Sequence, residues 1–229
     1  MPPKARAPGK AKSHSLLVFS NPEKEAHEAS DDPLVPDWPF RMLLCGPPNS
    51  GKRSTLLCIL SHLEQWPDKT SVLHLDPETI EYADLSPAIY GPDDPPNFED
   101  FDRGERNLLI VDEVDINSLK KQAQSDVERL FGHGSTHRNT SIALCFQTFH
   151  KIPPAIRRAC QHYILFKSCD KSELAQIALR AGVPKEDLLE MMGHILKDPH
   201  DSLWIDLTKA PDSPLRFRLN LWTPITRRL

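Results

Sequence analysis

Gly46-Pro47-Pro48-Asn49-Ser50-Gly51-Lys52 is the stretch that decides the fold. It fits the pattern G-x-x-x-x-G-K, the start of a loop whose backbone N–H groups surround nucleotide phosphates. An apolar run, residues 42–45, precedes the loop, and a helix-like stretch, residues 54–63, follows it. This pattern indicates a phosphate site only between a strand and a helix, and the flanking residues supply that context. The sequence therefore predicts binding of the β- and γ-phosphates of a nucleoside triphosphate, with Lys52 reaching their oxygens.

A second motif lies downstream, in residues 108–113. It reads Leu-Leu-Ile-Val-Asp-Glu, an apolar strand that ends in two carboxylates, which is the Walker B pattern. We expect Asp112 to hold Mg²⁺, directly or through water, and Glu113 to polarise the water that attacks the γ-phosphate. An ordinary solvated turn is the alternative interpretation, and the phosphate loop upstream argues against it. Asp115 is expected to be structural.

A third strand, residues 142–147, ends in a single amide, Gln147. In a parallel sheet, ligands bind at the carboxyl ends of the strands, so Gln147 would face the γ-phosphate and report its presence. A simple turn hydrogen bond from Gln147 remains the alternative.

The residue after Lys52 departs from the phosphate-loop pattern. A Ser or Thr hydroxyl at that position binds Mg²⁺, but this chain has Arg53, followed by Ser54. One residue along a helix turns a side chain by about 100°, so Ser54 cannot simply replace the missing hydroxyl. Either the helix start shifts, or Asp112, water and phosphates hold Mg²⁺ alone, or the site hydrolyses nucleotide slowly. The carboxylate pair favours an active site.

The composition is that of one α/β domain. The chain has 229 residues, a net charge of -4 and a pI near 6.2, so any DNA contact must be a local patch. We expect reduced thiols in an intracellular protein, because the cysteines form no C-x-x-C pair; they are Cys45, Cys58, Cys145, Cys160 and Cys169. No apolar run is long enough to cross a bilayer, so no membrane insertion is expected.

Strands and helices alternate along the chain, which favours a mostly parallel sheet covered by helices on both faces. The predicted strands are residues 42–45, 71–75, 108–111, 141–146, 163–166, 202–206 and 215–220, the last two as a terminal hairpin or edge strands. The predicted helices are residues 54–65, 118–132, 154–159, 171–181 and 185–196, and residues 91–106 are expected to be a surface loop. We expect a disordered basic tail at residues 1–14, with an added strand over residues 16–19. A single P-loop ATPase domain is predicted for residues 15–229, with its motor core at about residues 40–220.

Taken in order, these motifs resemble viral genome-packaging ATPases of the poxvirus type, in the FtsK/HerA superfamily. Residues 147–157, Gln-Thr-Phe-His-Lys-Ile-Pro-Pro-Ala-Ile-Arg, are similar to the family's Q…I-P-x-x-I-R segment. Residues 135–141 resemble its Arg-containing turn, and residues 203–207 and 215–220 its closing strands. The resemblance covers roughly residues 40–220.

The resemblance implies a RecA-like fold, with the strand of Gln147 beside the two Walker strands. It implies an ATP- and Mg²⁺-dependent motor that forms a ring, a pentamer or hexamer, and pumps double-stranded DNA into a preformed capsid through a capsid or portal-vertex protein. A neighbouring subunit would supply an arginine finger, for which Arg138 and Arg157 are the candidates. Such a motor would act in the host cytoplasm, at a viral factory, or in the nucleus, or be associated with the virion.

DNA contact is expected near Lys120 and Lys121, at the start of a predicted helix. The helix dipole disfavours cations there by about 0.3–1 kcal/mol each. This small cost suggests that the two lysines have a function, such as contact with DNA phosphates. A solvated helix start is the alternative.

Two further functions remain open. One is a cellular or plasmid DNA translocase or helicase of the same superfamily, and the other is a nucleotide-binding assembly protein with little hydrolysis. The compact chain favours packaging, because helicases commonly carry extra domains.

Overall fold

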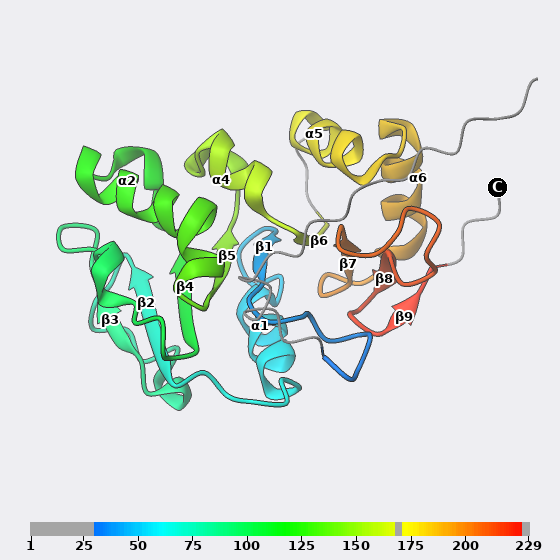
Figure 1. The fold of residues 1–229 in the computed structure, drawn as a ribbon. Coiled ribbons are helices and arrows are strands. Elements are labelled where there is room, and N and C mark those ends of the chain that lie inside the picture. Colours follow the sequence, from blue (N-terminus) through cyan, green and yellow to red (C-terminus); the bar gives the residue numbers. More distant parts are fainter. Residues whose placement is uncertain (1–29, 168–170, 226–229) are drawn as a thin grey trace, which may run out of the picture.

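The described residues, 30–167 and 171–225 of the computed structural model, form one nine-stranded sheet with several helices on one face and helix α1 on the other (Figure 1). The strands are β1 (Arg41–Cys45), β2 (Lys69–His74), β3 (Ala88–Tyr90), β4 (Asn107–Asp112), β5 (Thr140–Phe146), β6 (His162–Phe166), β7 (Ser202–Asp206), β8 (Phe217–Leu219) and β9 (Thr223–Pro224). The helices are α1 (Lys52–Ser61), α2 (Lys121–Arg129), α3 (Ser135–His137), α4 (Pro154–Ala159), α5 (Lys171–Ala181) and α6 (Lys185–Ile195). The predicted tail, residues 1–14, and the predicted strand at residues 16–19 lie outside the described residues.

The strand order is β3-β2-β4-β5-β1-β6-β7-β8-β9. The first six strands in this order, β3, β2, β4, β5, β1 and β6, run parallel. The last three, β7, β8 and β9, extend the sheet in antiparallel pairs. β5 lies between β1 and β4, so the strand that leads to Gln147 separates the two Walker strands, as the resemblance implied. The register aligns their ends, because Cys45 pairs with Phe146 and Asp112 pairs with Cys145. The prediction of a mostly parallel α/β sheet is confirmed.

Both faces of the sheet are apolar, which is why the parallel strands read as continuous hydrophobic runs. On β1, Leu43 and Cys45 belong to the core under α2, α4, α5 and α6. Met42 and Leu44 point to the other face, where α1 and the segment around Trp38 cover them. Each fully buried Leu contributes about 1.5–3 kcal/mol relative to an exposed one. The two cores therefore fix the register of β1, and with it the position of the phosphate loop that follows.

One predicted helix needs correction, and two short edge strands were missed. The helix expected from residue 118 begins at Lys121, because Ile116–Ser118 forms a 3₁₀ turn capped by Asp115, whose carboxylate accepts the N–H of Asn117. The same helix then continues through a π-helical segment, Leu130–Gly134. β3 and β9 were not predicted at all, since strands of three and two residues at the sheet edges leave almost no periodicity to detect.

The antiparallel extension contains a buried polar cluster. Arg218 lies 3.8 Å over the ring of Trp204, donates to the carbonyl of Leu34, and approaches Asp206 at 3.6 Å. His162 lies 3.4 Å from the same Asp206, and burial lowers the pKa of His162 to about 4. These contacts tie β6, β7 and β8 to the segment that precedes β1.

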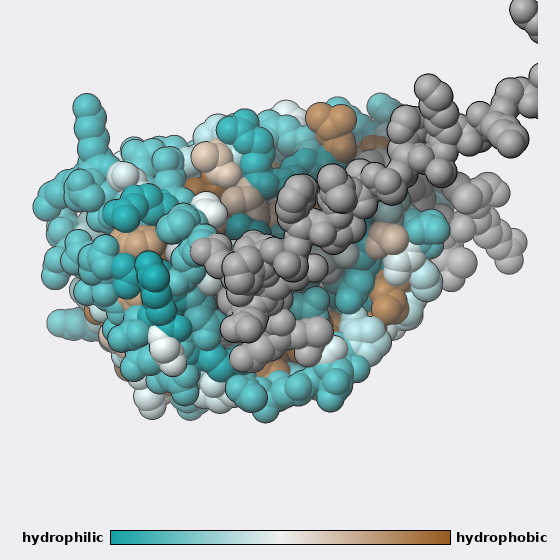
Figure 2. Space-filling model, in the orientation of Figure 1, coloured by the Kyte–Doolittle hydropathy of each residue, from teal (hydrophilic) through white to brown (hydrophobic). Residues whose placement is uncertain are grey.

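The exposed surface is largely polar. The face shown in Figure 2 is mainly hydrophilic, with apolar residues in small, separate areas. Among the described residues, no helix has both the length and the apolar character needed to cross a membrane. Thiols are free in all the described cysteines, namely Cys45, Cys58, Cys145 and Cys160, while Cys169 lies outside the described residues.

Candidate functional site

The phosphate loop connects β1 to α1 in a shape that two of its glycines permit. A Cβ at Gly46 would lie 2.5 Å from Cβ of Phe166, a clash with a packed side chain. Gly51, just before α1, has φ of 98°, in the left-handed region that glycine adopts at no steric cost. The loop is therefore closely packed and ends at the N-terminus of a ten-residue helix, where unpaired N–H groups attract anions.

Side chains of the loop supply two further groups for phosphate. Lys52 folds back over the loop, and its Nζ donates to the carbonyls of Gly46 at 2.9 Å and Pro47 at 3.0 Å. Ser50 is buried, and among the described residues its Oγ has no hydrogen-bond partner. Both groups are donors beside the helix N-terminus, so the loop can bind an anion as predicted.

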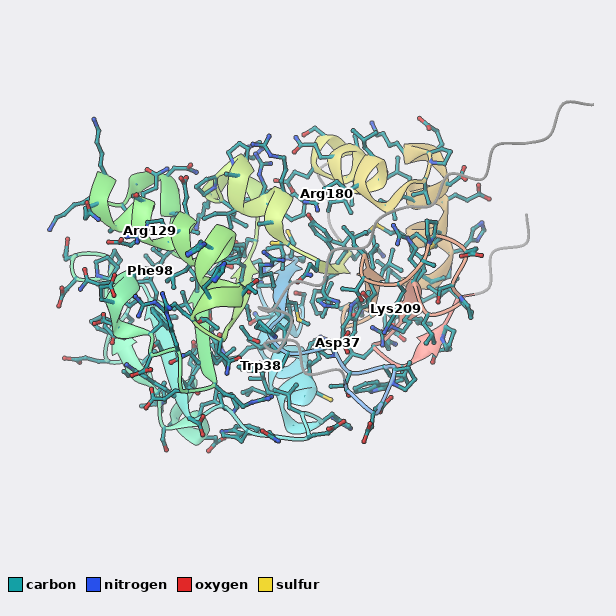
Figure 3. All side chains as sticks on the ribbon, viewed as in Figure 1. Asp37, Trp38, Phe98, Arg129, Arg180 and Lys209 are labelled. Carbon is teal, nitrogen blue, oxygen red and sulfur yellow. The ribbon has the colours of Figure 1, made fainter. Side chains whose placement is uncertain are left out.

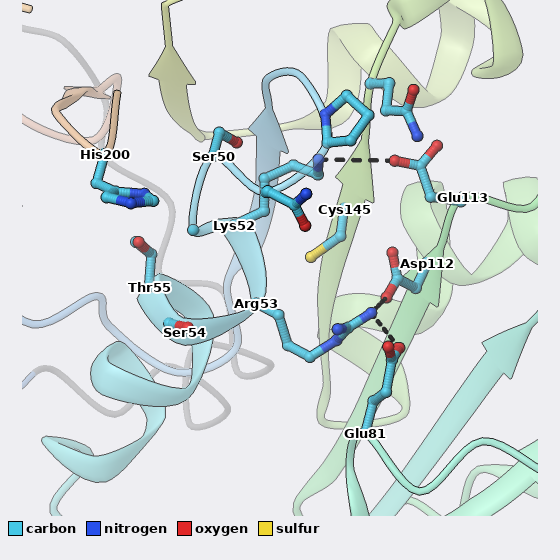
Figure 4. A pocket seen from close by; sticks show the side chains of 14 residues that line it. Ser50, Lys52, Arg53, Ser54, Thr55, Glu81, Asp112, Glu113, Cys145 and His200 are labelled. Carbon is cyan, nitrogen blue, oxygen red and sulfur yellow. Dashed lines mark hydrogen bonds and ion pairs between the residues drawn. The ribbon is translucent and has the colours of Figure 1, made fainter. Parts of the chain in front are cut away.

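Arg53 points across the pocket to the Walker B carboxylate (Figure 4). Its Nη2 donates to Oδ2 of Asp112 at 2.9 Å and also forms an ion pair with Glu81. The hydroxyl of Tyr82 donates to the same Oδ2 at 2.8 Å. Burial lowers the pKa of Arg53, but hydrogen bonds with Tyr82 and Asp112 outweigh burial and hold that pKa above its ordinary value. Asp112 is thus neutralised by a cation of its own chain.

Glu113 follows Asp112 in a strained conformation, with φ of 58°. A residue with a side chain rarely adopts this region, and such strain is concentrated at functional sites. Its Oε1 lies 3.7 Å from Nζ of Lys52, and its Oε2 lies 3.5 Å from Nζ of Lys151. Neither oxygen has a hydrogen-bond partner among the described residues. Both oxygens therefore lie beside ammonium groups and keep the capacity to accept hydrogen bonds.

The phosphate loop, Arg53, Asp112 and Glu113 line one cavity of about 670 Å³, large enough for a nucleotide. Gln147 lines it, as expected from its place after β5, together with residues of the phosphate loop and both Walker carboxylates. The cavity therefore brings together seven of the nine predicted nucleotide-binding positions, Pro48 to Ser54, with Asp112, Glu113 and Gln147, whereas Gly46 and Pro47 do not line it.

Magnesium does not fit this arrangement as the sequence predicted. His74, Glu81 and Asp112 have ligand atoms within 4.8 Å of one another, a donor set that could hold a metal. However, the guanidinium of Arg53 contacts both Glu81 and Asp112. A divalent ion about 4 Å from a guanidinium is repelled by about 8 kcal/mol at an effective dielectric constant of about 20. Ser54 lies on the side of α1 away from Asp112, so the hydroxyl set of a phosphate loop is not assembled (Figure 4).

The two candidate arginine fingers differ in their contacts. Arg138 forms an ion pair with Glu99, donates to the carbonyl of Phe101 and lies 4.8 Å over the ring of Phe98. Arg129 covers the same ring at 4.2 Å (Figure 3). These contacts commit Arg138 to anchoring the loop before β4 within its own chain.

Arg157 is on α4, and its Nη1 donates to Oε1 of Gln176 at 3.2 Å. It is partly exposed beside a cavity of about 210 Å³ between α4 and α5. Among the two candidates, Arg157 is the more available for an outside partner.

The predicted DNA contacts are exposed. Lys120 precedes α2, its Nζ donating to the carbonyl of Asp93 at 3.3 Å, and Lys121 is the first residue of α2. Neither lines the nucleotide cavity, and their role stays a prediction.

Several residues of the site were not predicted from the sequence. His74 ends β2, and the reasoning that found Gln147 could have found it too. Glu81, Lys151 and His200 reach the site from loops or short turns, for which the sequence carried no signal.

Comparisons with known proteins support the fold. No protein-family model matches the sequence, and no curated protein sequence matches it. A solved structure of the DNA-packaging ATPase from Sulfolobus turreted icosahedral virus superposes with a TM-score of 0.55 at 15% identity, covering 82% of this chain and 98% of that one. The genome-packaging NTPase of Sulfolobus turreted icosahedral virus 2 gives 0.53 with sulfate (82% and 97% covered) and 0.52 with ATPγS (82% and 98% covered), both at 15% identity. This likeness shows that the chain has the P-loop NTPase fold.

Proposed function

We propose that the chain is an ATP-hydrolysing motor that moves double-stranded viral DNA into a preformed capsid. The observation that carries the proposal is the cavity in which the phosphate loop, Asp112, Glu113 and Gln147 meet at the ends of three adjacent strands. The similarity of the fold to that of viral packaging NTPases also supports this proposal.

In this proposal the residues have separate tasks. The N-terminus of α1 and Lys52 bind the phosphates, because unpaired N–H groups and an ammonium converge there. Glu113 polarises the attacking water, and Gln147 reports the γ-phosphate. Copies of the chain form a ring around DNA in the infected cell, each completing the neighbouring site with an arginine, and a capsid or portal-vertex protein docks the ring. A cellular DNA translocase of the same superfamily would differ in lacking that capsid partner.

One observation favours a second candidate, an assembly protein that binds nucleotide and hydrolyses little. Lys52 and Lys151 flank Glu113, and Arg53 neutralises Asp112, so both carboxylates carry cations of their own chain. Hydrolysis requires Glu113 to leave at least one of these lysines.

The test is ATP hydrolysis with and without double-stranded DNA, for the whole protein and for Glu113→Gln. The motor predicts hydrolysis stimulated by DNA and lowered at least about 100-fold by the substitution, since a general base contributes about 10²–10⁴-fold. Asp115→Asn is the matched control, because Asn keeps the N-cap of the turn after β4. Nucleotide binding with hydrolysis equal to the buffer blank would reject the motor and leave the assembly protein.

A further inference from the structure

Arg53 gives the nucleotide site an internal cation. We propose that its guanidinium takes the place of the divalent metal, so that the chain binds a nucleoside triphosphate without requiring Mg²⁺. This inference rests on the proposed function, because it assumes that the triphosphate lies at the phosphate loop.

The position of Arg53 is the first argument. It is the second residue of α1, directly after Lys52, where a phosphate loop otherwise carries the hydroxyl that binds metal. Its side chain extends towards Asp112, the carboxylate that would hold the same metal (Figure 4). Arg53 therefore occupies the position of one protein group on which a metal site in this fold depends, and its guanidinium contacts the other, Asp112.

The contacts of Arg53 are the second argument. Nη2 contacts Asp112 and Glu81, and the guanidinium carbon lies 5.2 Å from the centre of the Tyr82 ring. Tyr82 also donates to Asp112, so one buried carboxylate oxygen holds both side chains. A metal ion at Asp112 would have to displace a cation that two carboxylates and an aromatic ring keep in place.

The third argument is a hydrogen-bond donor of Arg53, its Nε, that is buried and has no partner among the described residues. Arg53 also lines the cavity with Lys52, so two basic side chains from one turn of α1 face the phosphate site. A planar guanidinium can donate two parallel hydrogen bonds to phosphate oxygens, which suits it to bind the triphosphate directly.

The experiment measures the affinity of the whole protein for ATPγS by calorimetry, once in excess MgCl₂ and once in excess EDTA. For the natural chain we expect the dissociation constants in MgCl₂ and in EDTA to agree within about threefold. Arg53→Thr restores the hydroxyl of the pattern and removes the guanidinium. In that variant we expect EDTA to weaken binding by at least about tenfold relative to MgCl₂.

Two controls accompany it. Arg103→Thr makes the same exchange in an exposed loop and should behave like the natural chain. Lys52→Ala should lose binding under both conditions, which places the ligand at the phosphate loop. If Arg53→Thr does not fold, the comparison of EDTA with MgCl₂ on the natural chain still decides the proposal.

The outcomes separate the two proposals. Binding of ATPγS by the natural chain in MgCl₂ that EDTA abolishes would overturn the role of Arg53 and leave the proposed function standing. Absence of binding in either condition would overturn both. Equal binding in both conditions, with dependence on MgCl₂ created by Arg53→Thr, supports the inference.

Discussion

The Nζ atom of Lys151 lies 3.5 Å from Oε2 of Glu113 and donates to the carbonyl oxygen of the same residue at 3.4 Å. Lys151 ends the 3₁₀ turn Phe149–Lys151, just after Gln147. The segment that follows the Gln147 strand is therefore tied directly to the Walker B glutamate. A movement of Gln147 on contact with a γ-phosphate can in this way alter the freedom of Glu113.

Removing this tie should release the glutamate. We expect Lys151→Met to raise ATP hydrolysis in the absence of DNA by about 2–10-fold. The partly exposed ion pair between Lys151 and Glu113, worth about 1 kcal/mol, keeps Glu113 from the attacking water, and the substitution removes it. The stimulation by DNA should shrink accordingly. Steady-state phosphate release checks this, with Lys185→Met on α6 as the control. A fall in basal hydrolysis would show that Lys151 assists the reaction instead.

Gln147 should act on hydrolysis more than on binding. We expect Gln147→Ala to lower the hydrolysis rate by about 10²-fold, the cost of one lost hydrogen-bond donor at a developing charge. The dissociation constant for ATPγS should stay within a few-fold, since the phosphate loop is unchanged. Gln124→Ala on α2 is the matched control. Unaltered hydrolysis would leave Gln147 with a turn hydrogen bond alone.

Arg157 should act in a neighbouring subunit. We expect Arg157→Ala to abolish stimulated hydrolysis, because an arginine finger contributes about 10³–10⁵-fold. Glu113→Gln, which keeps Arg157, should be inactive as well. Mixing the two inactive proteins should restore part of the activity, since a mixed interface contains an intact Glu113 and an intact Arg157. Inactivity of the mixture would argue that both residues serve one subunit.

Lys120 and Lys121 should contribute to DNA affinity without sequence preference. Replacing both with Ala should weaken binding to any duplex and reduce the slope of log K against log salt by about 1.8, two phosphate contacts at about 0.9 each. Fluorescence anisotropy over a range of salt concentrations measures the slope. A slope equal to that of the natural chain would place the DNA contact elsewhere.

His162 should make the stability of the fold depend on pH. Its pKa is lowered to about 4 by burial, from 6.5 in the unfolded chain, although Asp206 opposes the shift. Between these values the unfolded state binds more protons, so the free energy of unfolding falls as pH falls from about 6.5 to 4. The loss should reach about 3 kcal/mol, at 1.36 kcal/mol per pKa unit. Urea unfolding across this range measures it, and His162→Asn should flatten the dependence.

Much of the fold could be predicted because its five central parallel strands, β2, β4, β5, β1 and β6, are buried on both sides. Their continuous apolar runs give strand positions almost to the residue, and the polar residue after each strand marks the edge where ligands bind. Asp112, Glu113 and Gln147 were found by that reasoning, and the cavity contains all three.

The contacts of Arg53 could not be predicted in the same way. Glu81 and Tyr82 come from an irregular loop after β2, and only the folded chain brings them to Asp112. The sequence showed that a hydroxyl was missing after Lys52, but not which side chains would surround its replacement. Arg138 likewise matched a motif, yet its contacts with Glu99 and Phe98 belong to the scaffold.

The two outermost strands limit how copies of this chain can meet. β3 has three residues and β9 only two, one of them Pro224, which has no N–H to offer a further strand. Sheets that end in such short strands resist lengthening by a neighbouring molecule. In the proposed ring, contacts between copies would therefore run through side chains on helices and loops, and such contacts can change during a cycle of hydrolysis without altering the strand pairing.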